Sequence, residues 1–191
     1  MQLKNLNCNF LGKTFYFYEE IDSTQDEIWR LVDNKKIVNG QLVAANIQTK
    51  GKGTHGRVWH TDESDNIAFS FYIEMGKNIS SLDGLTYEIA KVITDIFEEK
   101  YDISLDIKLP NDIMCNGKKI GGILTEAKVI GNKVKYLVIG VGINTNKSFF
   151  ANDIKNIATS IKKEFNIEIN SFDFISEFCN RFEKNIQRRS K

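Results

Sequence analysis

Hydrophobic positions along the chain follow two periods, and each period predicts a different kind of element. Runs rich in β-branched and aromatic residues, which favour strands, occupy residues 14–21, 41–47, 67–75, 105–109 and 134–144. Apolar residues at helical spacing predict helices over residues 24–34, 82–99, 154–165 and 172–188. These elements alternate without a regular βαβ order. We therefore expect an α+β fold, with a mixed or antiparallel β-sheet and helices packed mainly on one side.

Composition and charge narrow the class of protein. A chain of 191 residues is long enough for one domain with a sizeable core. Its 26 basic and 25 acidic residues leave a net charge of +1, which gives no reason to expect a nucleic-acid partner. No apolar run approaches the roughly 18 residues of a membrane span, and the N-terminus has no secretion signal. Three widely spaced cysteines suit a reducing compartment, so we expect a cytoplasmic protein.

The stretch from Lys108 to Glu126 carries the strongest local signal. It contains the only proline of the chain, and its Asn116-Gly117 pair between apolar residues predicts a tight β-hairpin. Such a hairpin would bring Asp112 and Lys119 close together at one end. The glycine pair that follows the lysine lacks Cβ atoms, so a ligand or another backbone can approach the second strand closely. On these features alone, a surface hairpin with solvated lysines is an equal alternative.

Two further polar segments are candidates for binding. Residues 48–66 form a long glycine-rich stretch that holds both histidines, and an unstructured loop of this length is usually functional. The stretch lacks the Gly-Lys-Ser/Thr ending of a Walker A loop, and its histidine spacing does not favour a metal site. Earlier in the chain, Thr24 is followed by Glu27 at capping-box spacing, which predicts Thr24 as a helix N-cap. Ser23 and Thr24 could also bind a neutral polar ligand.

Four separated stretches occur in a fixed order: DSTQ at 22–25, GKGTHGRVW at 51–59, KLPND with KKIGGILTE at 108–126, and GVGIN at 140–144. Together they closely resemble the catalytic domain of biotin protein ligases, the biotin–[acetyl-CoA-carboxylase] ligases. That family shows a Ser-Thr-Asn-like element, a Gly-Arg-Gly-Arg-x-Gly-Arg-x-Trp loop, Lys-Trp-Pro-Asn-Asp, a Lys before Gly-Gly-Ile-Leu-x-Glu, and Gly-Ile-Gly-Ile-Asn. A single motif would be weak evidence, whereas the ordered set is highly specific.

The resemblance implies an activity and a domain organisation. It implies ATP-dependent ligation of biotin, through biotinyl-5′-AMP, to one lysine of a biotin carboxyl carrier domain, with Mg²⁺ as a cofactor. It implies that residues 1–191 form one catalytic domain, with no N-terminal winged helix and with the small C-terminal β-barrel absent or greatly reduced. A homodimer is compatible with the family, and no nucleic-acid or membrane partner is expected.

The resemblance also assigns roles to residues of this chain. The implied catalytic residues are Lys119, Asp112 and Arg57. The implied biotin-binding residues are Ser23, Thr24, Gln25, Gln48, Gly121, Gly122 and Leu124. The implied nucleotide-binding and phosphate-binding residues are Gly51, Lys52, Gly53, Gly56, Arg57, Trp59, Asn111, Lys119 and Asn144. No residue is assigned to a protein-held metal site.

Some positions depart from the family pattern. Leu109 stands in place of the usual tryptophan, Lys52 and Thr54 stand where arginine is common, and His55 is unusual for this loop. Neither Lys nor Thr reproduces a bidentate guanidinium. The main alternative function is a lipoate or octanoate ligase or transferase, which shares the fold class. A carrier-binding or nucleotide-sensing protein without catalysis is a second alternative, although the chain retains both Asp112 and Lys119.

Overall fold

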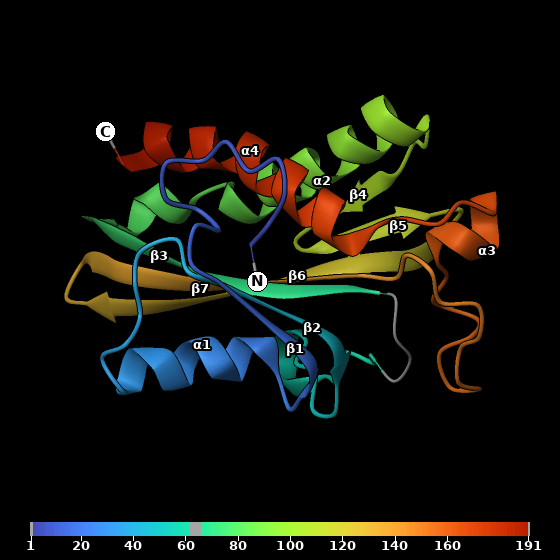
Figure 1. Cartoon of the computed structure of the whole chain (residues 1–191), viewed down its shortest axis with the longest axis horizontal. Coiled ribbons are helices and arrows are strands. Elements are labelled where there is room, and N and C mark those ends of the chain that lie inside the picture. The colour runs from blue at the N-terminus through green and yellow to red at the C-terminus, as the bar shows by residue number, and fades with distance from the viewer. Residues whose placement is uncertain (1, 62–65, 191) are drawn as a thin grey trace.

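The computed structural model describes residues 2–61 and 66–190. A seven-stranded sheet, in the order β1-β2-β3-β7-β6-β5-β4, forms its centre (Figure 1). The strands are β1 (Phe15–Ile21), β2 (Leu42–Gln48), β3 (Ile67–Asn78), β4 (Asp106–Lys108), β5 (Asp112–Cys115), β6 (Lys118–Ile130) and β7 (Lys133–Ile143). The α-helices are α1 (Thr24–Asp33), α2 (Leu85–Tyr101), α3 (Ile161–Phe165) and α4 (Ser171–Ser190). Two short 3₁₀ turns, Thr54–Gly56 and Ile79–Leu82, complete the elements.

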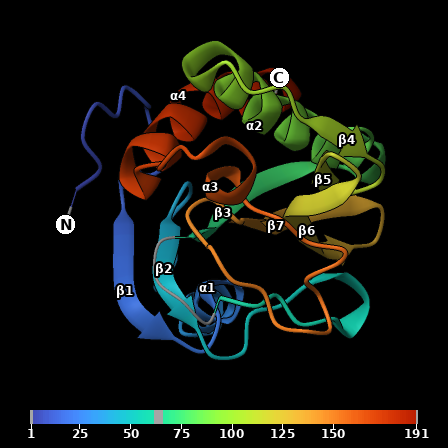
Figure 2. The ribbon, with the colours of Figure 1, turned by 90° about the vertical axis from the view of Figure 1, so that its right-hand side faces the viewer.

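The sheet is mixed and is covered on both faces. Strands β1 and β2 are parallel, whereas every other neighbouring pair is antiparallel. The two longest helices, α2 and α4, lie side by side on one face, and α1 lies on the other (Figures 1 and 2). The expected α+β class, with a mixed sheet and helices mainly on one side, is confirmed.

The two faces of the sheet carry separate hydrophobic clusters because side chains alternate along a strand. In β2, Leu42 and Ala44 belong to the large core under α2 and α4, whereas Val43 points to the smaller cluster under α1. Edge-on and tilted phenylalanine pairs join β3 to α4, with ring centroids of Phe69 and Phe178 5.2 Å apart. This double-sided burial makes the sheet a rigid support for loops at its edge.

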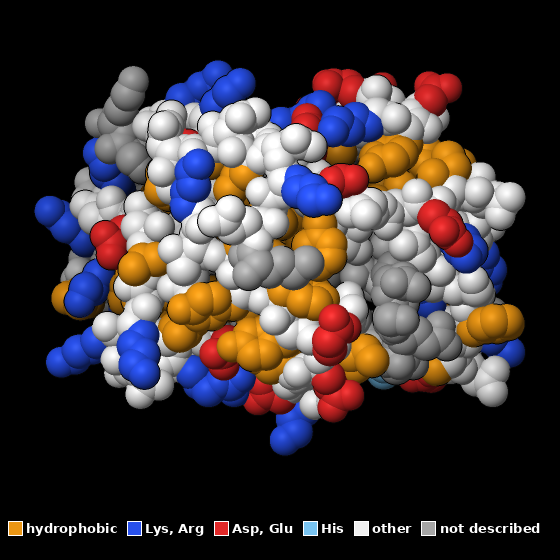
Figure 3. Space-filling view, viewed as in Figure 1, with side chains coloured by type: hydrophobic (Ala, Val, Ile, Leu, Met, Phe, Trp, Pro, Cys, Tyr) orange, Lys and Arg blue, Asp and Glu red, His pale blue; other side chains and the backbone are white. Residues whose placement is uncertain are grey.

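The surface agrees with the near-neutral charge of the sequence. Figure 3 shows side chains of both signs scattered over one face, with apolar side chains between them. Within the described part of the chain, no helix is both long and apolar enough to cross a membrane.

The prediction of a helix over residues 154–165 is wrong for most of that range. Only Ile161–Phe165 is helical, and the chain before it runs as turns. The reason is a competing backbone pairing: Lys119 N–H donates to the Ile157 carbonyl, and Thr159 N–H donates to the Lys119 carbonyl. These bonds hold residues 157–159 extended beside β6, and Ser160 then caps the short helix that follows.

Candidate active site

The β5–β6 hairpin forms as its sequence predicts. Asn116 and Gly117 both have positive φ, at 49° and 76°, as a type I′ turn requires. Lys119 pairs with Met114, two residues from Asp112, so both side chains lie on the same face. Lys119 Nζ is 2.6 Å from Asp112 Oδ1, and both side chains are partly buried. The expected proximity of this lysine and carboxylate is therefore confirmed.

Glycines on β6 and β7 make room for two large side chains. A Cβ at Gly142 would lie 2.4 Å from Trp59 Cε2, so the indole occupies the space that a side chain there would fill. A Cβ at Gly122 would lie 3.1 Å from Lys119 Nζ. Lys119 Nζ is 5.7 Å from the centre of the Trp59 ring, within reach of a cation–π interaction. The glycines thus allow the ammonium and the indole to meet over the sheet.

The stretch predicted as a long loop has more structure than expected over residues 48–61. Gln48 pairs with Thr61 and Lys52 pairs with Val58, both antiparallel, so residues 48–61 fold back on themselves as a narrow hairpin-like loop. Its tip is the 3₁₀ turn at Thr54–Gly56, where Arg57 Nη2 donates to Thr54 Oγ1 over 2.9 Å. Lys52 forms an ion pair with Asp26 of α1. The remainder of the predicted loop, residues 62–65, lies outside the described residues.

A hydrogen-bonded group of polar side chains closes one end of the site. Thr24 N–H and Oγ1 both donate to Gln48 Oε1, at 2.9 and 3.1 Å, and Gln48 Nε2 donates to Thr61 Oγ1. Thr24 Oγ1 also lies 2.9 Å from Ser70 Oγ. Ser70 was not predicted as a site residue. The available signal was a single hydroxyl inside the apolar run IAFSFYIEM.

The prediction that Thr24 caps the helix is wrong by one residue. Ser23 is the N-cap, in extended conformation, and its side chain accepts from the Asp26 N–H. The preceding Asp22 is fixed by Arg30, whose hydrogen bonds lower the Asp22 pKa to about 2. Because Ser23 takes the cap, the hydroxyl of Thr24 is left to face Gln48 and Ser70.

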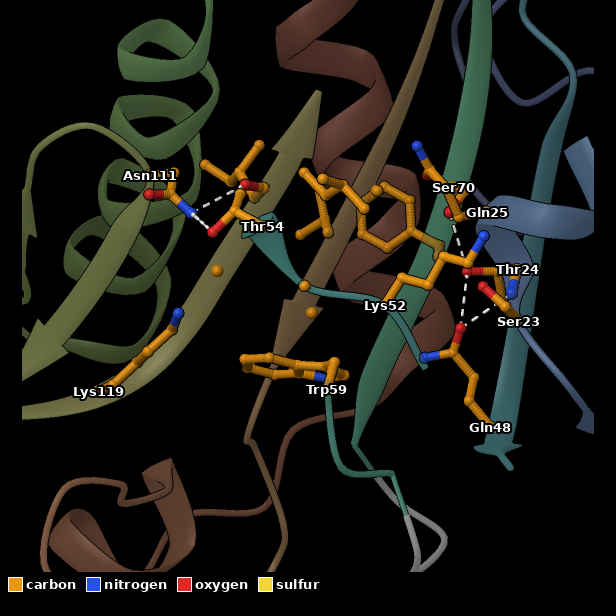
Figure 4. A pocket seen from close by; sticks show the side chains of 18 residues that line it. Ser23, Thr24, Gln25, Gln48, Lys52, Thr54, Trp59, Ser70, Asn111 and Lys119 are labelled. Atoms are coloured by element: carbon orange, nitrogen blue, oxygen red, sulfur yellow. Dashed lines mark hydrogen bonds between the residues drawn. The ribbon is translucent and has the colours of Figure 1, made fainter. Parts of the chain in front are cut away.

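Two adjoining cavities are lined by these elements. The first, of about 40 Å³, is lined by Ser23, Thr24, Gln25, Gln48, Lys52, Gly53, Thr54, Trp59, Phe69, Ser70, Asn111, Lys119, Gly122, Ile123, Leu124, Gly140, Val141 and Gly142. The second, of about 320 Å³, is lined by Gly53, Thr54, Arg57, Val58, Trp59, His60, Lys119, Asn144, Lys147, Phe150, Ile154, Ile157 and Ala158. Lys119 and Trp59, together with Gly53 and Thr54, line both cavities and so stand at the boundary. Figure 4 shows Lys119, Thr54 and Trp59 around the smaller cavity.

Most of the sequence-predicted site residues come together here, and four do not line either cavity. Gly51 and Gly121 let a neighbouring backbone pass close by. A Cβ at Gly51 would lie 2.3 Å from the Trp59 carbonyl oxygen, and one at Gly121 would lie 3.1 Å from the Gly142 carbonyl oxygen. Gly56 lies at the exposed turn with φ 74°. Asp112 lies next to the site and accepts a hydrogen bond from Lys119, which lines both cavities. Among the described residues, no cluster of three or more His, Cys, Asp or Glu side chains could hold a metal ion.

The model of the biotin/lipoate A/B protein ligase family matches residues 17–144. The chain belongs to this family. It is 34% identical over 181 residues to the bifunctional ligase/repressor BirA of Bacillus subtilis, an alignment that covers 94% of the chain and 55% of that protein. It is 29% identical over 125 residues to the biotin–[acetyl-CoA-carboxylase] ligase of Paracoccus denitrificans, covering 64% of the chain and 51% of that protein. The chain thus spans about half the length of these relatives.

The fold matches a solved member of the same family. The structure of the biotin protein ligase from Aquifex aeolicus in complex with biotin and ATP superposes with a TM-score of 0.77 at 26% sequence identity. The match covers 93% of this chain and 72% of that one. The family and the sheet architecture expected from the ordered motifs are therefore confirmed.

Proposed function

We propose that this chain catalyses the ATP-dependent ligation of biotin to a lysine of a biotin carboxyl carrier domain, through biotinyl-5′-AMP. Support comes from family membership and from the solved relative that binds biotin and ATP. The Paracoccus relative, a biotin–[acetyl-CoA-carboxylase] ligase, points to the carrier of acetyl-CoA carboxylase as the acceptor. We place the reaction in the cytoplasm, where the free, buried cysteines Cys8, Cys115 and Cys179 stay reduced.

The observation that carries the proposal is the position of Lys119 at the boundary between the two cavities. In the first step a biotin carboxylate oxygen attacks the α-phosphorus of ATP. A new P–O bond forms, the bond to the β-phosphate breaks, and pyrophosphate leaves. Both reactants are anionic, so a fixed cation between them lowers the repulsion and stabilises the charge of the transition state. Lys119 faces biotin in the smaller cavity and ATP in the larger one.

Other side chains of the larger cavity suit the nucleotide. Arg57 supplies a second cation, and Asn144 lies at the end of β7 with its Nδ2 bonded to the Thr159 carbonyl. Phe150, Ile154 and Ile157 supply an apolar wall for a nucleobase. We assign the phosphates to the Lys119 and Arg57 side and the base to this wall.

Asp112 is the carboxylate that Lys119 contacts directly. Mg²⁺ usually binds substrate phosphates together with one or two protein carboxylates, so a single carboxylate at this place suits Mg²⁺ that arrives with ATP. In the second step the carrier lysine amine attacks the acyl carbon and AMP leaves. Asp112, held by Lys119, is our candidate to accept the proton that the amine loses.

The main alternative, ligation of lipoate, differs at the closed end of the smaller cavity. Lipoate ends in an apolar dithiolane ring, whereas biotin ends in a ureido ring with two donors and one acceptor. The polar side chains Ser23, Thr24, Gln25, Gln48 and Ser70 line this end, which favours biotin. Most of these groups bond one another, but Gln25 Oε1 has no hydrogen-bond partner within the described part of the chain, and a buried group left unpaired costs about 1–3 kcal/mol.

The test is transfer to a purified carrier domain in the presence of ATP, with labelled biotin and labelled lipoate in parallel. We expect biotin to label the carrier and lipoate to label it at least 100-fold more slowly. A carrier in which the acceptor lysine is replaced by arginine is the control for nonspecific labelling. Labelling by lipoate alone, or by neither compound, would refute the proposal.

A further inference from the structure

Thr54 holds the side chain of Arg57 with two of its oxygen atoms. Arg57 Nη2 donates to Thr54 Oγ1 over 2.9 Å, and Arg57 Nε donates to the Thr54 carbonyl over 3.2 Å. One edge of the planar guanidinium is therefore taken up by Thr54, which leaves the two N–H groups of Nη1 for other acceptors. Arg57 lines only the larger cavity, whereas Thr54 lines both. Thr54 thus stands where the two cavities meet, next to a cation of the larger one.

Asn111, in the bend between β4 and β5, also donates to the Thr54 hydroxyl. Its Nδ2 lies 3.4 Å from Thr54 Oγ1 and 3.3 Å from the Ile123 carbonyl oxygen. Figure 4 shows Asn111 and Thr54 facing each other. Because the carbonyl can only accept a hydrogen bond, the NH₂ group must be the end of the amide that faces it. The Ile123 N–H donates to the Asn111 carbonyl over 3.0 Å, which fixes Asn111 to β6.

These contacts decide where the proton of the Thr54 hydroxyl can go. A threonine oxygen has two lone pairs and one O–H group. Both lone pairs face groups that can only donate, the Arg57 guanidinium and the Asn111 NH₂, so the O–H group can point to neither. No oxygen of the described residues accepts this proton. The O–H group is thus an unused donor at the boundary of the cavities, and the charged donor Arg57 polarises it and strengthens it.

We propose that Thr54 is a nucleotide-binding residue whose hydroxyl donates a hydrogen bond to a non-bridging oxygen of the α-phosphate, in ATP and in biotinyl-AMP. The inference rests on the proposed function. The α-phosphate keeps a negative charge throughout the reaction, whereas the biotin carboxylate loses its charge when the anhydride forms. A donor at the boundary that must serve both states therefore suits the phosphate. Arg57 and Asn111 act as positioning residues, because they hold the hydroxyl oxygen and turn its proton toward the ligand.

The test compares the dissociation constants of two ligands that differ at the phosphate. Biotin carries only its carboxylate, whereas biotinol-5′-AMP carries the α-phosphate in a stable ester that cannot transfer biotin. Thr54→Val keeps the shape of the side chain and removes the hydroxyl. We expect it to weaken binding of biotinol-5′-AMP roughly 10- to 100-fold and binding of biotin about twofold or less. Thr54→Ala should show the same pattern, and Thr54→Ser, which keeps a hydroxyl, should stay within about threefold of the wild-type chain for both ligands.

A second comparison separates donation to the phosphate from support of Arg57. If the hydroxyl served only to hold the guanidinium, Thr54→Val would have no further effect in a chain that already carries Arg57→Ala. Direct donation predicts that Thr54→Val still weakens biotinol-5′-AMP roughly fivefold or more in that background. The matched control is His55→Asn, at the exposed tip of the same turn, where asparagine tolerates the positive φ of 57°. It should keep the wild-type dissociation constants of both ligands.

The outcomes also separate this inference from the proposed function. Failure of the wild-type chain to bind biotin and biotinol-5′-AMP would overturn both. An unchanged dissociation constant of biotinol-5′-AMP in Thr54→Val would overturn the inference alone, and so would an equal loss for the two ligands. A loss in Thr54→Ser as large as that in Thr54→Val, or no further loss in the Arg57→Ala background, would overturn it as well.

Discussion

The indole of Trp59 lies against Gly142 so closely that any side chain at position 142 would displace it. A Cβ there would be 2.4, 2.6 and 2.8 Å from three atoms of the ring. Trp59 belongs to the 48–61 loop and Gly142 lies near the end of β7, so this contact holds the loop against the sheet. Trp59 Nε1 is buried there without a hydrogen-bond partner in the described part of the chain.

Gly142→Ala should therefore weaken binding of biotin and ATP by displacing Trp59. We expect a roughly 10-fold or greater rise in dissociation constant, since overpacking typically costs about 1–3 kcal/mol. Isothermal titration of Gly142→Ala, Trp59→Ala and the double variant forms a thermodynamic cycle. If the effect runs through Trp59, adding Gly142→Ala to Trp59→Ala changes little. Full additivity of the two changes would contradict this explanation.

Asp112→Asn should affect transfer to the carrier more than formation of biotinyl-AMP. The asparagine keeps the shape and can still accept a hydrogen bond from Lys119, but it cannot take up a proton from the carrier amine. General-base catalysis typically contributes 10²- to 10⁴-fold, so single-turnover transfer from preformed biotinyl-AMP should slow by about that factor. Equal losses in the two steps would instead assign Asp112 to the nucleotide or its Mg²⁺.

Ligand binding should order the 49–59 segment. The smaller cavity, at about 40 Å³, is far below the roughly 300–1,000 Å³ of ordinary ligand pockets, so the segment must move to admit biotin. The backbone bonds of its outer part run within the segment itself, among them Gly53 N–H to the Arg57 carbonyl and Trp59 N–H to the Gly51 carbonyl. Amide hydrogen exchange should be fast without ligand and slower with biotin and ATP. Peptides from α2 are the internal control, and equal exchange of 49–59 in both states would contradict the prediction.

Glu183 of α4 should contribute to stability by holding the N-terminal segment. Its carboxylate accepts from the N–H groups of Asn9, Phe10 and Leu11, at 2.7, 3.0 and 2.9 Å. Burial alone would raise the Glu183 pKa, but these backbone hydrogen bonds outweigh it, and the pKa lies below the usual range. Glu183→Ala should lower the free energy of unfolding by about 2–3 kcal/mol and the melting temperature by roughly 5–10 °C.

The pH dependence follows from the lowered pKa of Glu183. A carboxyl group whose folded pKa is lowered stabilises the fold fully above its unfolded pKa, about 4.3, and loses this contribution as pH falls through the folded value. The stability difference between the wild-type chain and Glu183→Ala should therefore be constant near pH 7 and shrink below about pH 4. Urea unfolding at several pH values checks this, with the exposed Lys184→Ala as control. A difference that grows toward acid pH would contradict it.

Local sequence patterns correctly predicted the elements whose conformation depends mainly on their own residues. The 82–99 periodicity corresponds to α2 (Leu85–Tyr101) because its apolar stripe meets the sheet, and Asn116-Gly117 forms the turn that its positive φ values demand. The segment before α3 failed because its backbone pairs with Lys119, a partner more than 35 residues away in the chain. A pattern read from a short stretch of sequence cannot show that this distant strand competes for the backbone hydrogen bonds of a helix.

The sequence motifs predicted which residues meet in the site. They predicted less well the roles that depend on a single hydrogen bond. Lys119, Trp59 and Gly122 meet as the ordered motifs implied. The assignment of the N-cap missed by one residue, since Ser23 and Thr24 can both cap a helix and only the tertiary contact of Thr24 with Gln48 separates them. Ser70 was missed because its partner, Thr24, lies on another element.

The central claim is that Lys119 joins the two cavities and activates the biotin carboxylate. The most direct measurement is formation of labelled biotinyl-AMP and pyrophosphate from biotin and Mg–ATP, without a carrier, by the wild-type chain, Lys119→Ala and the matched control Lys118→Ala. Removing a donor aimed at developing charge typically costs 10²- to 10³-fold in rate. We predict rapid formation by the wild-type chain and by Lys118→Ala, and a loss of about that size in Lys119→Ala with its melting temperature retained. Wild-type rates in a folded Lys119→Ala variant would contradict the account.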